Sequence, residues 1–283
     1  MTPPLIATVA DVRRHVDLER KRGRKIALAP TMGALHAGHG ALIDRARREP
    51  DCVVVSIFVN PIQFDRRTDY EAYVINLQED LEFCAARGAD LVFAPSTEEM
   101  YPTPPGTFVE VTGLSEHLCG RFRPGHFRAV ATVVAKLFHI VAPDRAYFGE
   151  KDAQQVAIIQ KMVVDLNFPV EIIPVPTVRE TDGLALSSRN RRLNAEERRA
   201  APALYRALTA ARDSIAHGTV IAAEAKQAAF QVLAQEPRIR VEYLEVVDPT
   251  SLAPVERIEG PVRIAVAVWL GETRLIDNVH YAG

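Results

Sequence analysis

The sequence predicts an α/β fold, a Rossmann-like doubly wound parallel sheet with a smaller C-terminal α+β domain. Over the first two thirds of the chain, short apolar runs alternate with segments of helical periodicity, as they do in β-α-β units. The runs, such as residues 52–59, are apolar and β-branched without alternation, which is typical of strands buried on both faces. Near residue 180 the order changes to helices followed by strands, which favours a second domain of α+β type.

Each element follows from its local pattern. We expect strands at residues 25–29, 52–59, 90–94, 145–148 and 170–178, and helices at 38–48, 69–87, 130–141 and 156–166. In the second part we expect helices at 195–217 and 221–235, strands at 241–247, 262–270 and 274–278, and a turn at 271–273. Gly88 and Gly218 are natural helix ends. The predicted domains are residues 1–182 and 183–283.

Composition limits the kind of partner. The chain has 283 residues, with 34 Lys and Arg against 36 Asp and Glu, a net charge of −2. This balance argues against a nucleic-acid coat, which usually carries a basic excess, but leaves room for a local basic pocket that binds a small anion. Three cysteines without a CxxC pair argue against a disulfide framework. No secretory signal or membrane-length apolar run is visible, so we expect a cytoplasmic protein with no membrane segment and no nucleic-acid partner.

The segment PTMGALHAGH, residues 30–39, follows the first long strand and opens a helix. A helix N-terminus at the carboxyl end of a strand offers free N–H groups to a phosphate. Gly33 and Gly38 let a ligand approach the backbone closely. His36 and His39 face one side of the first turn, where each can donate a hydrogen bond to phosphate. The alternative is a pair of ordinary loop histidines, which the HxGH spacing at this junction disfavours.

Three further polar segments accompany it. FVNPIQF places the neutral side chains Asn60 and Gln63 after a strand, although Asn-Pro alone also explains a turn. GEKDAQQ places Lys151 and Asp152 after another strand, suited to phosphate and to a ribose hydroxyl, or to a solvated helix start. VRETDGLALSSRN joins two hydroxyls to an arginine at the domain boundary, which suits an anion better than a plain hydrophilic linker.

The HxGH spacing resembles the HIGH motif of class I nucleotidylyltransferases, and the SSRN segment lies where that superfamily has its KMSKS loop. Together PTMGxLHxGH, FVNPxQF, GRxRPGHF, FGEKDxQQ and PTVRExDGLAxSSRN occur here in order. That set resembles the pantothenate synthetase (pantoate–β-alanine ligase) family, from about residue 25 to 194 and more weakly beyond.

The resemblance implies an activity and a set of roles. Members join pantoate to β-alanine through a pantoyl adenylate, with ATP giving AMP and pyrophosphate. It implies that the first domain binds ATP and pantoate and that the second acts as a lid. His39 matches the proton donor, and His36, Lys151 and Arg189 are the other catalytic candidates. The implied ATP-binding residues are Met32, Gly33, Ala34, Leu35, His36, Ala37, Gly38, His39, Gly149, Glu150, Lys151, Asp152, Val178, Leu186, Ser187, Ser188 and Arg189.

Gln63 and Gln155 match the residues that hold pantoate and border the β-alanine site, and Asn60 and Arg123 are assigned to the same site. Mg²⁺ is expected to accompany ATP through phosphate oxygens and water, with no ligand set fixed by the protein. A homodimer is expected by resemblance alone. Two alternatives stay open: another HxGH nucleotidylyltransferase such as a cytidylyltransferase, and a non-catalytic ATP-binding regulator. A class I aminoacyl-tRNA synthetase fits less well because no RNA-binding extension is evident.

Overall fold

The structure is a computed structural model that describes residues 2–49, 51–64, 70–71, 73 and 76–283. The chain separates into two compact units. The first comprises residues 1–115, 123–150 and 155–176, and the second comprises 116–122, 151–154 and 177–283. The main division therefore falls at residues 176 and 177, and two short segments from the first part of the chain belong to the second unit.

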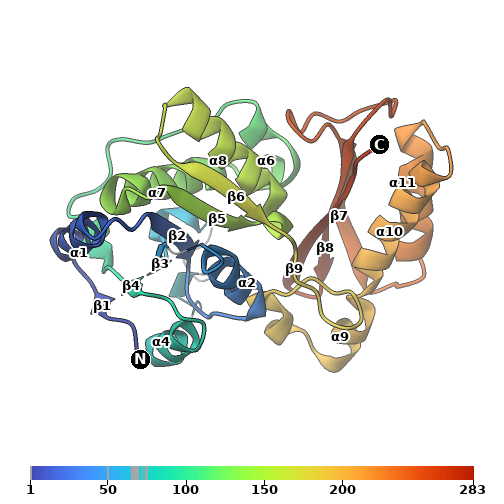
Figure 1. Ribbon diagram of the computed structural model, residues 1–283. Coiled ribbons are helices and arrows are strands. Elements are labelled where there is room, and N and C mark those ends of the chain that lie inside the picture. The colour runs from blue at the N-terminus through green and yellow to red at the C-terminus, as the bar shows by residue number, and fades with distance from the viewer. Residues whose placement is uncertain (1, 50, 65–69, 72, 74–75) are drawn as a thin grey trace. The chain divides into compact units, whose positions relative to one another are not determined.

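The first unit contains a six-stranded parallel sheet, coloured from blue to yellow-green in Figure 1. Its strands are β1 (Leu5–Ile6), β2 (Ile26–Thr31), β3 (Cys52–Ile57), β4 (Leu91–Phe93), β5 (Arg145–Gly149) and β6 (Glu171–Val175). They lie in the order β1-β4-β3-β2-β5-β6 and every neighbouring pair is parallel. The predicted doubly wound parallel sheet is confirmed, with β1 as a short edge strand that the apolar pattern did not predict.

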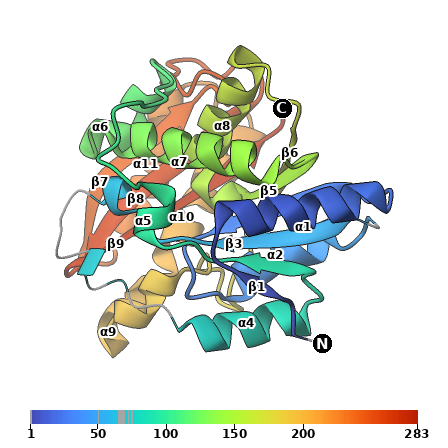
Figure 2. The ribbon, with the colours of Figure 1, turned by 90° about the vertical axis from the view of Figure 1, so that its left-hand side faces the viewer.

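Helices cover both faces of this sheet. The main ones are α1 (Val9–Lys21), α2 (Ala37–Ala46), α4 (Leu77–Ala86), α7 (His126–Val141) and α8 (Ala153–Asp165). Figure 2 shows α1 and α7 together on one side of β3, with α2 and α4 on the other. Shorter helical segments of the first unit are η1 (Pro61–Gln63), α5 (Thr97–Met100) and most of η2 (Leu114–Glu116), whereas α6 (Leu118–Phe122) and most of η3 (Glu150–Asp152) belong to the second unit. β3 is buried at every position, Ser56 included, as its largely apolar run predicts.

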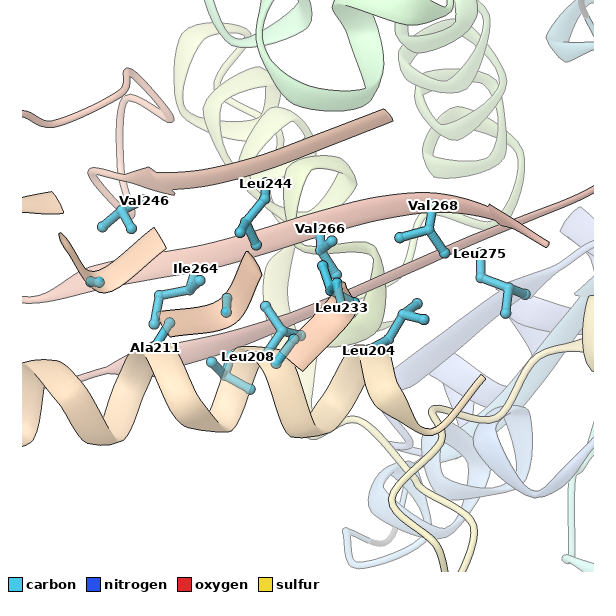
Figure 3. Packing of buried hydrophobic residues seen from close by; sticks show 14 of the residues in the cluster. Leu204, Leu208, Ala211, Leu233, Leu244, Val246, Ile264, Val266, Val268 and Leu275 are labelled. Atoms are coloured by element: carbon cyan, nitrogen blue, oxygen red, sulfur yellow. The ribbon is translucent and has the colours of Figure 1, made fainter. Parts of the chain in front are cut away.

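The second unit pairs helices with an antiparallel sheet. Its helices are η4 (Ser188–Arg192), α9 (Ala195–Ala200), α10 (Ala203–Ala216) and α11 (Ala222–Leu233), and its strands are β7 (Ile239–Val247), β8 (Val262–Leu270) and β9 (Thr273–Tyr281) in the order β7-β8-β9. Figure 3 shows Leu204 and Leu208 of α10 against Val266 and Leu275 of the sheet. The predicted α+β character of this part is confirmed.

Two predicted helices differ from the structure. The single helix expected at 195–217 is wrong: α9 and α10 are separated at Pro202, whose ring nitrogen has no hydrogen to donate into a helix. The helix expected at 69–87 is wrong in its start, because Asn76 is extended and its side chain accepts from the Glu79 N–H as the cap of α4. Residues 69, 72, 74 and 75 of that prediction lie outside the described residues.

None of the helices formed by the described residues has the length and apolar character needed to cross a membrane.

Candidate active site

The HxGH segment lies where the winding of the parallel sheet changes direction. β2 has β3 on one side and β5 on the other, so the chain first extends the sheet one way and later returns to extend it the other way. Ligands of open α/β sheets bind at the carboxyl ends of strands at such a point. Residues 32–36 follow β2 directly, and α2 begins at Ala37. The segment thus occupies the expected position of a nucleotide site.

The two histidines are fixed through main-chain hydrogen bonds at the start of α2. His36 caps the helix, and its Nδ1 accepts from the Gly38 N–H at 3.1 Å. His39 Nδ1 in turn accepts from the His36 N–H at 3.3 Å. The two imidazole centroids are 4.1 Å apart. The structure therefore brings the two predicted histidines together and uses the same ring atom of each in a capping box.

This arrangement assigns the proton in each ring. A neutral imidazole has one nitrogen that accepts and one that donates. Because Nδ1 accepts from an N–H in both His36 and His39, the proton of the neutral ring belongs on Nε2 in both. In the neutral form of each ring the N–H therefore lies on the nitrogen opposite the one that accepts the main-chain hydrogen bond.

The carboxyl end of β5 supplies a second predicted segment. Gly149 ends the strand and Glu150 follows it, half-buried. Since β5 pairs in parallel with β2, their carboxyl ends meet at one edge of the sheet. Gln155 lies half-buried in the first turn of α8. The structure therefore brings Gly149 and Glu150 to the edge that carries the HxGH segment.

Asn60 is used inside the fold. Its side chain is 1% exposed; Nδ2 donates to the Ala129 carbonyl at 3.3 Å, and Oδ1 accepts from the Tyr101 hydroxyl at 3.1 Å. Burial raises the pKa of Tyr101 to about 12, so its hydroxyl stays protonated. Asn60 thus joins the end of β3 to α7, and this structural task accounts for its amide.

Gln63 and Arg123, both assigned to the pantoate site, lie next to each other. The Gln63 carbonyl accepts from Arg123 Nη2 at 3.3 Å and from the ring N–H of His126 at 3.1 Å. Arg123 also contacts the other nitrogen of the His126 ring at 3.2 Å. The main chain of Gln63 is therefore held by two residues, while its side chain, half-buried, is not needed for that contact.

The second unit contains a small pocket that combines two predicted segments with apolar residues of α10 and β9. Its lining residues include Lys151, Ser187, Arg189, Arg274 and Asp277. The structure therefore brings together the predicted cations Lys151 and Arg189. Arg274 was not predicted, and its guanidinium is held by the Glu242 carboxylate at 2.5 Å.

The predicted anion-binding segment forms a narrow loop. The Leu186 N–H donates to the Val178 carbonyl at 2.9 Å, and the Glu180 N–H donates to the Leu184 carbonyl at 2.8 Å. Gly183 has a φ of +91°, and a Cβ there would meet the Tyr205 ring at 2.4 Å, so glycine is required at the tip. The Ser187 hydroxyl accepts from the Arg189 N–H at the start of η4, next to Ser188.

A buried ion pair anchors this loop to β9. Arg179 donates through both terminal nitrogens to Asp277, at 2.6 and 2.9 Å, and its guanidinium stacks on the Tyr205 ring at 3.9 Å. The Asp277 side chain is 2% exposed. Burial raises the pKa of Asp277 above its ordinary value, against the opposing effect of Arg179. Such a pair is costly to break by removing one partner only.

No predicted role covers Arg179, Asp277, Arg274 or Asp80. Arg179 pairs with Asp277, Arg274 pairs with Glu242, and Asp80 accepts from the Ala34 and Leu35 N–H groups, and each of these partners lies more than 30 positions away in the sequence. Their signal in the chain was weak: Arg179 lies inside a motif, but its carboxylate partner is 98 residues away. Asp80 lies in a helix whose pattern indicates only an amphipathic surface. Among the described residues, no group of three or more His, Cys, Asp or Glu is placed to hold a metal ion.

The sheet, its switch point and the capped HxGH pair define the class, an α/β protein with a Rossmann-like doubly wound sheet and a histidine pair at its switch point. Comparison with known proteins narrows this class. The model of the pantoate-beta-alanine ligase family matches residues 4–280, and the chain belongs to that family. A pantothenate synthetase of Moorella thermoacetica is 53% identical over 275 residues, covering 97% of each chain. One from Thermotoga neapolitana is 50% identical, covering 97% of this chain and 98% of the other.

Solved structures agree with this assignment. A pantothenate synthetase from Thermus thermophilus superposes with a TM-score of 0.92 at 48% identity, covering 97% of this chain and 98% of the other. A pantoate-beta-alanine ligase from Francisella tularensis, described as complexed with beta-gamma ATP and beta-alanine, has a TM-score of 0.79 at 33% identity, covering 98% and 97%. Both the parallel sheet and the separate three-stranded sheet match such structures.

Proposed function

We propose that the chain is an ATP-dependent ligase that condenses pantoate with β-alanine through a pantoyl adenylate, releasing AMP and pyrophosphate. The observation that carries the proposal is the HxGH pair at the carboxyl end of β2, with Nδ1 of both rings bound to the main chain. Two neutral Nε2–H donors at a sheet switch point suit the oxygens of a triphosphate. Family membership and the ATP and β-alanine bound by the Francisella relative support the choice of substrates.

The proposed first step forms the adenylate. A pantoate carboxylate oxygen attacks the α-phosphorus of ATP, and the bond from that phosphorus to the pyrophosphate oxygen breaks. Negative charge grows on the leaving pyrophosphate and on the α-phosphate oxygens. We assign its stabilisation to His36 and His39, each donating a hydrogen bond from Nε2–H without transferring the proton, and to Lys151 and Arg189 as cations.

The proposed second step forms the amide. The free amine of β-alanine attacks the acyl carbon, the tetrahedral intermediate loses AMP, and the amine proton passes to solvent. No covalent enzyme intermediate is needed, so catalysis rests on holding the reactants in line and keeping water from the adenylate. We assign pantoate binding to Gln63 and Gln155. Arg123 supports this site by holding the Gln63 main chain, and Asn60 supports it by linking the end of β3 to α7.

The remaining contacts are proposed for the nucleotide. We assign Asp152 to the ribose, the Val178 main chain to adenine, and Ser187 and Ser188 to the phosphates. Gly149, Glu150 and residues 32–38 are proposed to line the ATP site, with Leu186 leading into the phosphate-binding turn. Mg²⁺ is proposed to arrive with ATP, since phosphate oxygens and water are ligands that it prefers.

A three-substrate assay with product identification tests the function. AMP and pantothenate should form only when pantoate, β-alanine and ATP are all present, and the rate should vanish when EDTA removes Mg²⁺. ADP as product, or turnover with CTP and no β-alanine, would contradict the proposal. Pantoate labelled with ¹⁸O in its carboxylate tests the intermediate, because one labelled oxygen must leave with AMP. AMP without label would exclude the adenylate.

The assembly and location are also proposals. We propose a homodimer, which light scattering on the purified protein would measure, and a cytoplasmic location, which cell fractionation would measure.

A further inference from the structure

Asp80 is a buried carboxylate bound to the loop that precedes the two histidines. It lies in the first turn of α4 and is 3% exposed. Its Oδ2 accepts from the Ala34 N–H at 3.0 Å, and its Oδ1 accepts from the Leu35 N–H at 2.7 Å. An ionised carboxylate is costly to bury unless hydrogen bonds replace its water. The two loop amides, together with the N-terminal end of the α4 dipole, supply that replacement.

The loop amides that Asp80 binds belong to an unusual turn. Gly33 has a φ of 79° and Ala34 a φ of 52°, so two successive residues are left-handed. That conformation is open to glycine but disfavoured for alanine because of its Cβ. Successive N–H groups aimed at one anion form a small concave binding site on the backbone. Here the anion is the side chain of Asp80, which stabilises the turn at the position where it is strained.

The turn leads directly into the catalytic candidates. Leu35 is 8% exposed and belongs to the core of the first unit. The next residue, His36, caps α2 and gives its N–H to His39 Nδ1. The direction in which both Nε2–H groups point therefore depends on the backbone that Asp80 holds.

We propose that Asp80 is a positioning residue of the ligase, which keeps the Gly33-Ala34 turn left-handed so that His36 and His39 present their donors to the phosphates. The inference rests on the proposed function for what the histidines bind. The Ala34 and Leu35 amides are bound to the Asp80 carboxylate, so these two groups are not available to the nucleotide.

Asp80→Asn tests the proposal against Glu79→Gln. Both changes remove one negative charge from the first turn of α4, but Glu79 is exposed and its side chain does not bind the loop. In Asp80→Asn an amide NH₂ faces a loop N–H in place of an acceptor. We expect kcat/KM for ATP to fall about tenfold or more, as for a lost buried hydrogen bond to a charged group, while Glu79→Gln stays within about twofold. Equal kinetics of the two variants would overturn the proposal.

A rescue experiment separates positioning from a general role in packing α4. Glycine adopts a positive φ without strain, so Ala34→Gly should restore part of the loss in the Asp80→Asn background. The ratio of kcat/KM between Asp80→Asn/Ala34→Gly and Ala34→Gly should be smaller than that between Asp80→Asn and the unaltered protein. A merely structural role would leave the two ratios equal, with a lowered melting temperature in both Asp80→Asn variants.

Hydrogen exchange of the unaltered protein measures the Asp80 contact directly, whether or not the Asp80→Asn variant folds. The Ala34 and Leu35 amides should exchange slowly despite lying in a loop, and fast exchange at both would overturn the proposal. Failure of the proposed function has a different signature: the three-substrate assay would show no turnover, while slow exchange of these two amides would still report the Asp80 contact.

Discussion

The two loops with predicted phosphate contacts are built in different ways. Residues 32–39 of the first unit are held mainly through the backbone, by Asp80 on the turn and by the imidazoles on the start of α2. Residues 179–190 of the second unit are held by a side-chain pair, Arg179 with Asp277. The first loop carries two imidazoles at a helix start, and the second carries Arg189 in η4, after a hairpin with a glycine tip. We therefore expect the first loop to fix the direction of hydrogen bonds to the phosphates and the second loop to supply positive charge.

The largest effect on stability is expected from the Arg179–Asp277 ion pair, which anchors the second loop. Arg179→Leu should lower the free energy of unfolding by about 3–5 kcal/mol, because it leaves the Asp277 carboxylate buried without its cation. Urea unfolding followed by fluorescence of Trp269, the chain's only tryptophan and part of β8, measures this change. Arg179→Leu combined with Asp277→Leu should recover much of the loss. A single variant that costs less than about 1 kcal/mol would show that solvent takes over the charge.

In the first loop, the Nε2–H donor of His39 should matter more for the reaction rate than the hydrogen bond by which its Nδ1 caps α2. His39→Ala should lower kcat about 10²-fold, the effect of losing one transition-state donor. His39→Asn sharpens the comparison, because its Oδ1 can replace Nδ1 as acceptor from the His36 N–H but it lacks the Nε2–H. Both variants should be equally slow in the AMP-forming assay, and a fast His39→Asn would assign His39 to capping. His280→Ala, on an exposed histidine of β9, should not change the rate.

Gln63 should show a smaller and more selective effect. Gln63→Ala should raise KM for pantoate roughly tenfold, since one neutral side-chain hydrogen bond is lost, and should leave KM for ATP nearly unchanged. The main-chain contacts with Arg123 and His126 stay. Gln78→Ala, an exposed change on α4, serves as the control. A change in ATP kinetics instead of pantoate kinetics would remove Gln63 from its assigned role.

The smallest effect on stability is expected from the hydrogen bond between Arg198 and Asp182 of the second loop, and it should depend on pH. The hydrogen bond from Arg198 lowers the pKa of Asp182. A lowered folded-state pKa means that this stabilisation is present above about pH 4, the ordinary Asp value, and is lost as pH falls through the folded pKa. Arg198→Ala should therefore be less stable by about 0.5 kcal/mol at pH 6, an amount limited by solvent screening. The difference should shrink as the pH is lowered below about 4, and a difference independent of pH would contradict the assignment.

The sequence allowed the strands and the polar motifs to be predicted for a common reason, which is that their signals are local. β3 and β8 are apolar runs interrupted only by Ser56 and Arg263, and the HxGH and SSRN segments carry their chemistry within a few residues. The supports could not be predicted in this way. Asp80 and Leu35 are 45 residues apart and Arg179 and Asp277 are 98 apart, so only the folded chain shows that they meet. Pro202 is a local signal for the break between α9 and α10. The helical periodicity of residues 195–217 continues across it, so the pattern predicted one helix.

The two-residue turn between β8 and β9 has a consequence for how the second unit becomes competent. β8 ends at Leu270, β9 begins at Thr273, and Gly271 between them is left-handed. This turn sets the strand alignment that places Asp277 between Leu275 and Val279, on the buried side of β9. A slip of one residue would turn Asp277 to the opposite face and remove the anchor of Arg179. The loop of residues 179–190 can therefore be anchored only after β8 and β9 have paired in the correct register. A unit with the wrong register could be compact and still fail to hold that loop in place.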